Sequence, residues 1–145
     1  MARVKIDLPE TFNFKTSFPV RITDLNYGNH VGNDKVLGFI HEARVRWLVS
    51  LGYSELKMEG VGMIMADATL QFKSEIFYGD ELEVSLQPVE FSRIGFDLVY
   101  KIEKKSSKNT ELAALAHTSM ICYDYSLKKV TSLPEAAKTR MTNVS

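Results

Sequence analysis

The chain is organised around residues 23–33, which read Thr23-Asp24-Leu25-Asn26-Tyr27-Gly28-Asn29-His30-Val31-Gly32-Asn33. This polar, glycine-rich segment separates an alternating pattern of apolar residues from the only long helical pattern in the sequence. It contains one acid, Asp24, and one histidine, His30, together with two of the eight glycines. Loops held between regular elements are where catalytic and binding residues concentrate, so we expect the functional site here.

A long helix is predicted directly after this segment. From residue 33 onward, apolar residues recur every three or four positions, at Val36, Ile40, Ala43, Trp47 and Leu51. Further apolar residues widen that stripe, which predicts a helix buried on most sides. We expect Asn33 to cap the helix, Asp34 to lie at the positive end of its dipole, and Gly52 to end it.

Strand patterns lie on both sides of this helix. Residues 12–22 alternate between apolar and polar side chains, and Pro19 places that strand near a sheet edge or a bulge, because proline cannot donate to a ladder. Residues 61–66 and 111–125 are apolar on both faces, which predicts two central strands.

The remaining segments predict a compact antiparallel arrangement. Residues 82–86 and 94–102 alternate again, and residues 104–109 are expected to form a solvated hairpin tip. Ser132-Leu133-Pro134-Glu135 is expected to begin a short final helix. Short connections favour antiparallel strands, and the long helix must cover one sheet face, so we predict an α+β fold.

Composition is that of one ordinary soluble domain spanning residues 1–145. Eighteen basic residues balance eighteen acidic ones, so no charge excess favours nucleic acid or an anionic membrane. No apolar run reaches the length of a signal peptide or a membrane span. The single cysteine, Cys122, lies in an apolar strand pattern. We therefore expect a cytoplasmic protein, without membrane insertion, whose thiol is buried and unreactive.

The acid and the following helix together suggest hydrolytic chemistry. The first turn of a helix presents unpaired N–H groups and partial positive charge, which can hold an oxyanion. A nearby carboxylate, here Asp24, could act as a nucleophile or a general base. The competing interpretation is that Asp24 and Asn26 only form Asx turns, the commoner role of such residues. His30 could be a base, a hydrogen-bond donor or a structural turn residue.

Other chemistries lack their sequence motifs. The three histidines, His30, His41 and His117, are not spaced as metal ligands, so no metal site is expected. The sequence contains no Gly-x-Ser-x-Gly elbow, phosphate loop or dinucleotide fingerprint. Glu42 and Arg44 are expected to form surface or interface ion pairs.

These residues resemble the acyl-CoA thioesterases of the hotdog fold, the 4-hydroxybenzoyl-CoA thioesterase-like group. That group carries an Asp-x-Asp or Asp-x-Asn pair, then Gly-His-Val-Asn-Asn, then Glu-(Glu)-Ala-Arg in a helix. The matching residues are Asp24, Asn26, His30, Val31, Asn33 and Glu42-Ala43-Arg44. The likeness continues through residues 72–84 and Leu133-Pro134. Here the glycine lies one place earlier, as Gly28-Asn29-His30, and Val31-Gly32-Asn33 replaces Val-Asn-Asn.

The resemblance implies a five-stranded antiparallel sheet wrapped around one long helix, paired into a homodimer or homotetramer with sites at the interface. Asp24 would attack a thioester carbonyl or deprotonate water, and Asn26 and His30 would position the water, the carboxylate or the loop. The oxyanion hole and loop support would come from Gly32, Asn33 and Asp34. The acyl chain would lie against Val36, Phe39, Ile40, Met63 and Met65, for which simple core packing is the commoner role.

The implied reaction is hydrolysis of an acyl thioester, carried by CoA or by an acyl-carrier protein, without a metal or redox cofactor. Two alternatives stay open. One is a hotdog module that binds acyl-CoA without turnover. The other, ranked lower, is an enoyl-CoA hydratase, a group that carries proline where Tyr27 stands in this chain.

Overall fold

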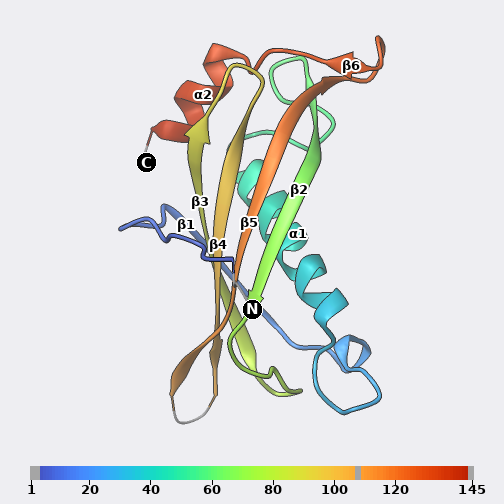
Figure 1. The fold of residues 1–145 in the computed structure, drawn as a ribbon, viewed down its shortest axis with the longest axis vertical. Coiled ribbons are helices and arrows are strands. Elements are labelled where there is room, and N and C mark those ends of the chain that lie inside the picture. The colour runs from blue at the N-terminus through green and yellow to red at the C-terminus, as the bar shows by residue number, and fades with distance from the viewer. Residues whose placement is uncertain (1–3, 107–108, 144–145) are drawn as a thin grey trace.

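The computed structural model describes residues 4–106 and 109–143. Figure 1 shows a sheet with one long helix along one of its faces. The elements in chain order are β1 (Phe14–Pro19), a 3-10 helix η1 (Ile22–Asp24), α1 (Asn33–Ser50), β2 (Gly62–Phe72), β3 (Glu81–Phe91), β4 (Gly95–Lys105), β5 (Thr110–Asp124), β6 (Lys129–Val130) and α2 (Glu135–Thr142).

The sheet is antiparallel throughout, with the strand order β1-β3-β4-β5-β2. The two-residue strand β6 adds to it by pairing with β5. This arrangement confirms the predicted α+β fold, a five-stranded antiparallel sheet around one long helix, and adds one short strand that the sequence patterns did not predict. The prediction of a central strand at residues 111–125 is confirmed, because β5 pairs with both β4 and β2.

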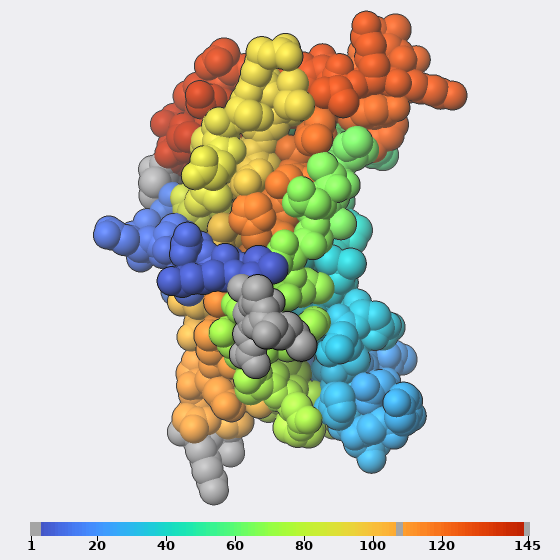
Figure 2. All heavy atoms as spheres, in the orientation of Figure 1, coloured from blue at the N-terminus to red at the C-terminus, as the bar shows by residue number. Residues whose placement is uncertain are grey.

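The two faces of the sheet are covered by different parts of the chain. Alternation along β4 turns Leu98 and Tyr100 toward the main core under α1, while Val99 faces the other way. There Val99 packs with Leu115 and with Ile6 of the N-terminal segment. Figure 2 shows this segment, in blue, lying across the strands. The long helix therefore lies on the face opposite to the N-terminal segment.

The position of β2 corrects one prediction. Residues 61–66 were expected to form a central strand, but β2 is the last strand in the sheet order and, within the described residues, pairs only with β5. An apolar pattern on both faces does not show how many neighbouring strands a segment has, and here Met63 is buried whereas Met65 is 40% exposed. The prediction for β1 is confirmed, since the strand that contains Pro19 is the opposite edge.

The ends of α1 are set by two glycines. Gly32 is the N-cap, and Asn33 is the first helical residue, so the prediction of an Asn33 cap is wrong. A Cβ atom at Gly32 would lie 2.6 Å from Asp34 Oδ1, at the end of an exposed side chain. Gly52 has a φ of +83° and follows the last turn, as predicted for the stop. Helix α2 is the predicted final helix, with Pro134 at its N-cap.

The surface of α1 corrects a second prediction. The helix was expected to be buried on most sides, but it exposes Leu37, Val45 and Val49. The sequence stripe was wide because apolar residues also occur on the face that the described chain leaves open. Of these residues, Leu37 lines a hollow together with Met65 of the edge strand β2, and Met65 is 40% exposed.

Other predictions are settled locally. Cys122 is buried, and burial raises the pKa of its thiol to about 11, as expected for an unreactive cysteine.

In the predicted hairpin tip, Ser106 N–H donates to the carbonyl of Asn109, and residues 107–108 lie outside the described residues. Across residues 4–106 and 109–143, every helix is too short or too polar to cross a membrane.

Candidate functional site

The loop between β1 and α1 is tied to the sheet at both ends. Val20 N–H donates to the carbonyl of Asp80 at 3.1 Å, and Val31 N–H donates to the carbonyl of Ile76 at 2.8 Å. Both acceptors belong to the connection between β2 and β3. The loop therefore leaves and rejoins the scaffold at fixed points, which holds the side chains between them in place.

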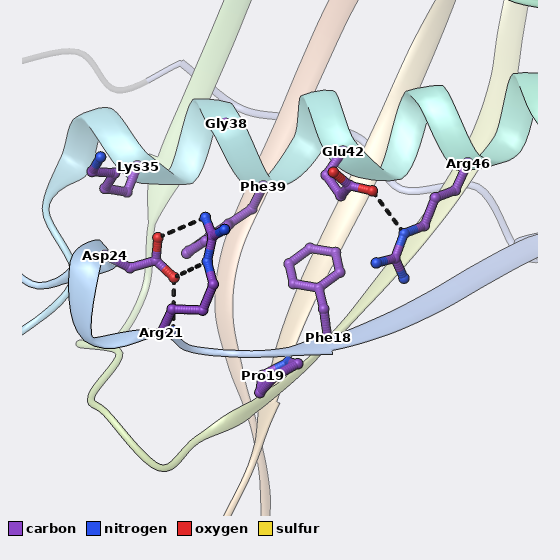
Figure 3. A pocket seen from close by; sticks show the side chains of 9 residues that line it. All are labelled: Phe18, Pro19, Arg21, Asp24, Lys35, Gly38, Phe39, Glu42 and Arg46. Atoms are coloured by element: carbon purple, nitrogen blue, oxygen red, sulfur yellow. Dashed lines mark hydrogen bonds and ion pairs between the residues drawn. The ribbon is translucent and has the colours of Figure 1, made fainter.

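Asp24 is buried at the end of η1, with 2% of its side chain exposed. Its Oδ2 accepts hydrogen bonds from the Arg21 backbone N–H at 2.8 Å and from Arg21 Nε at 3.4 Å. Its Oδ1 lies 3.2 Å from Arg21 Nη2. Among the described residues, Arg21 is thus the partner of both carboxylate oxygens. Figure 3 shows the guanidinium on the side of Asp24 that faces Phe18 and Phe39.

Asn26 and His30 shape the rest of the loop. Asn26 Oδ1 accepts a hydrogen bond from Gly28 N–H at 2.8 Å, which is the Asx turn weighed as an alternative for this residue. His30 Nδ1 lies 3.1 Å from the Val31 carbonyl, so this nitrogen carries the proton if the contact is a hydrogen bond. A Cβ atom at Gly28 would lie 3.3 Å from both Asn26 Oδ1 and His30 Nε2, so the two side chains meet over this glycine.

The first turn of α1 follows immediately. Gly32 is extended, with φ −73° and ψ 153°, and its carbonyl accepts from Lys35 N–H at 3.0 Å. The first N–H groups of a helix have no intrahelical acceptor, so those of Asn33 and Asp34 point out of the helix end. The acidic side chain of Asp34 lies in this turn, where the helix dipole favours a negative charge.

A hollow of about 400 Å³ opens between β1 and α1, with Asp24 in its wall. Two aromatic rings, Phe18 and Phe39, line it at a centroid distance of 5.7 Å. Charged residues complete the lining, and Glu42 accepts a hydrogen bond from Arg46 at 2.8 Å. The full lining is Phe18, Pro19, Arg21, Asp24, Lys35, Gly38, Phe39, Glu42 and Arg46 (Figure 3). We call this space the Asp24 hollow.

Two further hollows flank the same helix. One of about 640 Å³ lies on the other side of α1, against β2, and contains Asp34, His41, Arg44, Met63 and Met65 in its lining. The other, of about 300 Å³, is lined by residues of the loop, the start of α1 and the segment 72–76. We call them the β2 hollow and the His30 hollow.

The structure distributes the sequence-predicted residues among these spaces. Phe39 lines the Asp24 hollow with Asp24 itself. The β2 hollow has Asp34, Met63 and Met65, and the His30 hollow has His30, Asn33 and Val36. Ile40 is fully buried in the core, and Asn26 and Gly32 lie together at the loop. Within one chain, then, the predicted residues do not share a single cavity.

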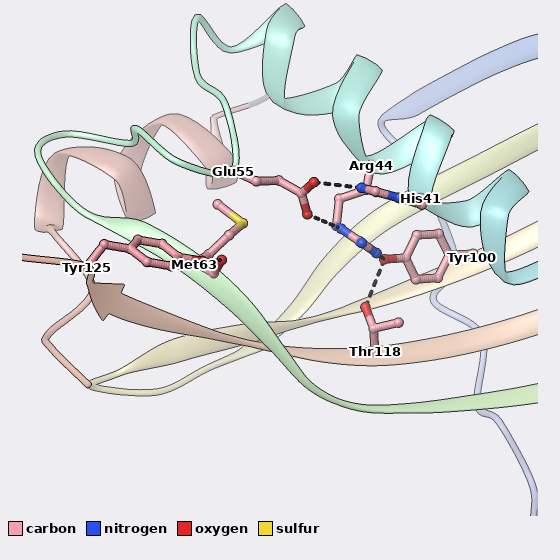
Figure 4. Close-up of polar contacts among 7 residues, drawn as sticks. All are labelled: His41, Arg44, Glu55, Met63, Tyr100, Thr118 and Tyr125. Carbon is pink, nitrogen blue, oxygen red and sulfur yellow. Dashed lines mark hydrogen bonds and ion pairs between the residues drawn. The ribbon is translucent and has the colours of Figure 1, made fainter. Parts of the chain in front are cut away.

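A buried polar network on α1 was not predicted from the sequence. Arg44 donates from Nε to Glu55 Oε2 at 3.0 Å and from Nη1 to Tyr100 OH at 3.1 Å. Tyr100 OH is 2.8 Å from Thr118 Oγ1, and His41 Nε2 is 2.8 Å from Glu55 Oε1. Figure 4 shows these side chains linking α1 to β4 and β5. Glu42 pairs with Arg46 on the surface, as expected. Arg44 also forms an ion pair, with Glu55, but its side chain is only 6% exposed, so this pair is not on the surface.

The network perturbs the acid–base properties of its members. Burial by itself would lower the pKa of Arg44, but Tyr100 and Glu55 raise it above its ordinary value. Burial by itself would raise the pKa of Glu55, but hydrogen bonds from His41 and Arg44 bring it below the ordinary value. Burial also raises the pKa of Tyr100. A sequence signal existed, because Arg44 lies four residues after Ile40 and three before Trp47, on the buried stripe of α1.

Comparison with known proteins places the fold. The family model described as the thioesterase-like superfamily matches residues 20–141. A 1,4-dihydroxy-2-naphthoyl-CoA thioesterase from Synechocystis is 25% identical, with a TM-score of 0.80 over 90% of this chain and 96% of that chain. A thioesterase from Thermus thermophilus, solved with coenzyme A and zinc, is 22% identical, with a TM-score of 0.77 over 92% and 95%. The described residues therefore have the hotdog fold that the resemblance implied.

Curated sequences add a partial match. A protein of Aquifex aeolicus (strain VF5) that carries an esterase name is 33% identical over 69 residues. The match covers 46% of this chain and 54% of that protein, so it spans about half the length of this relative. Among the residues that the structure describes, no three His, Cys, Asp or Glu side chains gather as a group that could hold a metal ion.

Proposed function

Because the chain belongs to the thioesterase-like superfamily, we propose that it hydrolyses acyl thioesters, with Asp24 as the nucleophile or general base. The observation that carries the proposal is the placement of Asp24. A buried carboxylate lies in the wall of a hollow that the first turns of α1 also line, through Lys35 and Gly38. A hollow of about 400 Å³ is large enough for a small acyl group.

The reaction can proceed in two ways from this placement. In the first, Asp24 attacks the thioester carbonyl carbon, the carbon–sulfur bond breaks with departure of the thiolate, and water then hydrolyses the mixed anhydride. In the second, Asp24 takes a proton from water, the hydroxide attacks the carbonyl, and the thiol leaves. Both routes convert a thioester and water into a carboxylic acid and a thiol.

The developing negative charge on the carbonyl oxygen needs donors near the same point. We assign this role to backbone N–H groups around Gly32, Asn33 and Asp34, because the N-terminus of α1 presents free donors and the positive end of its dipole. We assign a positioning role to Asn26 and His30, whose contacts around Gly28 fix the loop that carries Asp24.

We further propose that the active form is a homodimer, formed through the open edge of β2 and the exposed face of α1. Two observations support it: β2 offers eleven residues of unpaired edge within the described chain, and the exposed Leu37 of α1 lines the same hollow as Met65 of β2. A second copy seated there would close the β2 hollow. Size-exclusion chromatography with light scattering tests this: wild type should be dimeric and Met65→Lys monomeric, whereas a fully active wild-type monomer would contradict the proposal.

The central test is thiol release from a panel of acyl-CoAs. The panel should include aromatic acyl groups, since the solved relatives are named as thioesterases of 1,4-dihydroxy-2-naphthoyl-CoA and 4-hydroxybenzoyl-CoA. Asp24→Asn should keep the fold and lose about 10²- to 10⁴-fold in turnover. The matched control is Asp97→Asn, the same change on the opposite sheet face, where Asp97 pairs with His117. Hydrolysis by Asp24→Asn at the wild-type rate would remove Asp24 from the mechanism.

The same panel separates the alternatives. Saturable acyl-CoA binding without thiol release would favour a binding module, which is the interpretation that fits an Asp24 fully occupied by Arg21. Loss of the enoyl absorbance of crotonyl-CoA without thiol release would favour hydration.

A further inference from the structure

The ion pair between Arg21 and Asp24 is strongly asymmetric. Asp24 is 2% exposed, whereas the Arg21 side chain is 73% exposed. The carboxylate is therefore fixed in the protein, and the guanidinium that covers it has water on its other side. In such a pair the arginine is the partner that can move, because its guanidinium is already hydrated and water can take its place beside the carboxylate.

The individual hydrogen bonds show what would change if the Arg21 guanidinium moved away from Asp24. Asp24 Oδ1 has Arg21 Nη2 as its partner, at 3.2 Å. Asp24 Oδ2 is held by the Arg21 backbone N–H at 2.8 Å, a contact that does not depend on the side chain. If the guanidinium moved away, Oδ1 would be uncovered while Oδ2 stayed anchored. The carboxylate would keep its position and gain a free oxygen for attack or proton transfer.

With the guanidinium in place, both carboxylate oxygens of Asp24 are already hydrogen-bonded to Arg21. A positive charge 3.2 Å from an oxygen stabilises the carboxylate and occupies its lone pairs. The ion pair between Arg21 and Asp24 therefore has to open for the proposed reaction, and another anion in the hollow would have to take the place of Asp24 beside Arg21.

The distribution of charge around the Asp24 hollow favours the binding of such an anion. Arg21, Lys35 and Arg46 line it, against two carboxylates, Asp24 and Glu42. Arg46 is bound to Glu42 at 2.8 Å and to Thr16 Oγ1 at 2.8 Å, so it is held in place. Lys35 forms no ion pair with any described residue. The lining of the hollow thus has one more cation than it has carboxylates, and one of these cations, Arg21, can change partner.

We propose that Arg21 is an exchangeable cover of Asp24 that selects acyl groups carrying a carboxylate. This inference rests on the proposed function. The substrate carboxylate pairs with Arg21 and Lys35, Arg21 leaves Asp24 Oδ1, and the freed oxygen faces the thioester carbonyl. A carboxylate only a few bonds from that carbonyl stays within the reach of the Arg21 side chain. The phosphates of CoA, at the far end of the pantetheine arm, do not.

The test uses two pairs of thioesters that differ by one charge. Glutaryl-CoA is compared with valeryl-CoA, and 4-carboxybenzoyl-CoA with 4-methylbenzoyl-CoA. Wild type should prefer the carboxylated member of at least one pair by about tenfold or more in kcat/KM, the size expected for a hydrogen bond to a charged group. Arg21→Ala should lose that preference in a specific way: hydrolysis of the carboxylated thioester falls, and hydrolysis of the uncharged one stays equal or rises.

A purely structural role for Arg21 could not produce this result, in which hydrolysis of the carboxylated thioester falls while hydrolysis of the uncharged one stays equal or rises. Arg21→Lys, which keeps the charge, should retain part of the preference, and Arg93→Ala, a change at the turn between β3 and β4, should leave it unaltered. Equal loss on both members of each pair, or a wild type without preference, would overturn the proposal while leaving the thioesterase function standing. A wild type that hydrolyses none of the four, nor any of the wider panel, would overturn both.

Discussion

Two arginine–carboxylate pairs flank the helix α1, and they are built in opposite ways. On the β1 side, Asp24 is buried and Arg21 is 73% exposed. On the β2 side, Arg44 is 6% exposed and its partner Glu55 is 26% exposed. The charged groups are the same, but in one pair the arginine is at the surface and in the other it is inside.

The difference determines what each pair can do. Arg44 is bound by Glu55 and Tyr100, and Tyr100 continues to Thr118, so the guanidinium joins α1 to two strands. Moving it would leave buried polar groups without partners, which is costly. Among the residues that the structure describes, the Arg21 side chain pairs with Asp24 alone, and it can exchange this anion for another. We therefore regard Arg44 as a structural brace and Arg21 as the mobile member of the site.

The largest effect is expected from removing the brace. Arg44→Met keeps most of the apolar volume but deletes the charge, and should lower the free energy of unfolding by about 2–3 kcal/mol, because Glu55 and Tyr100 lose a buried partner. Urea denaturation followed by circular dichroism measures it. The control is Arg46→Met on the same helix, whose exposed pair with Glu42 should matter by less than about 1 kcal/mol. Equal losses in the two variants would erase the distinction between buried and exposed pairs.

A smaller loss of stability is expected from a change at Tyr100, the hydrogen-bond partner of Arg44. Tyr100→Phe removes the hydroxyl that accepts from Arg44 and contacts Thr118, and should cost about 1–2 kcal/mol in unfolding free energy. Tyr125→Phe is the comparison, since the Tyr125 hydroxyl donates to the Met63 carbonyl at 3.3 Å nearer the surface. If Tyr100→Phe were as mild as Tyr125→Phe, Arg44 would be held by Glu55 alone.

The brace should also weaken in acid. Glu55 has a folded-state pKa below its ordinary value of 4.5, so its contribution to stability is present above pH 4.5 and is lost as the pH falls through that lowered pKa. Glu55→Gln should be less stable than wild type at neutral pH, and the gap should close on acidification. Urea midpoints between about pH 3 and pH 7 measure this. A gap that stayed constant would mean that the charge of Glu55 does not stabilise the fold.

The smallest effect on stability is expected at the mobile pair. Arg21→Ala should lower the free energy of unfolding by less than Arg44→Met does, because the guanidinium is exposed, water can replace it beside Asp24, and the backbone bond from Arg21 to Asp24 remains. Thermal and urea unfolding of Arg21→Ala beside Arg44→Met provide the comparison. A loss as large as that of Arg44→Met would make Arg21 a second brace and exclude its exchange.

The comparison also explains which features could be predicted from the sequence. Periodicity indicates which way side chains face, so the helix, the alternating strands and the edge position of β1 could be predicted. It does not indicate which strands become neighbours, and β2 was misplaced for that reason. Asp24 was singled out by its loop and by family resemblance, and its role stays a prediction.

The two arginines escaped sequence reasoning for different reasons. Arg44 occupies a position of the buried helical stripe, and a charge there could have been read as needing a buried partner. Arg21 looks like an ordinary outward residue of an alternating strand. The chain turns in the 3-10 helix η1, and this turn brings the Arg21 side chain beside Asp24, three residues later. Spacing of this kind, with an acid three positions after the first residue of a turn, resembles a helix cap and is the one available signal.

The order of the strands has a consequence for how the protein assembles. Strands β3, β4 and β5 are consecutive in the chain and form a central meander, whereas the edges depend on distant pairings, Phe14 with Leu86 and Gly62 with Tyr123. Pairings between distant residues carry the larger loop-closure cost, so we expect the meander to form first and the edges to join late. The loop that carries Asp24 follows one late strand and α1 leads to the other. Hydrogen exchange should then find β4 amides the slowest, and opening of the edges would dismantle the site while the middle of the sheet stays folded.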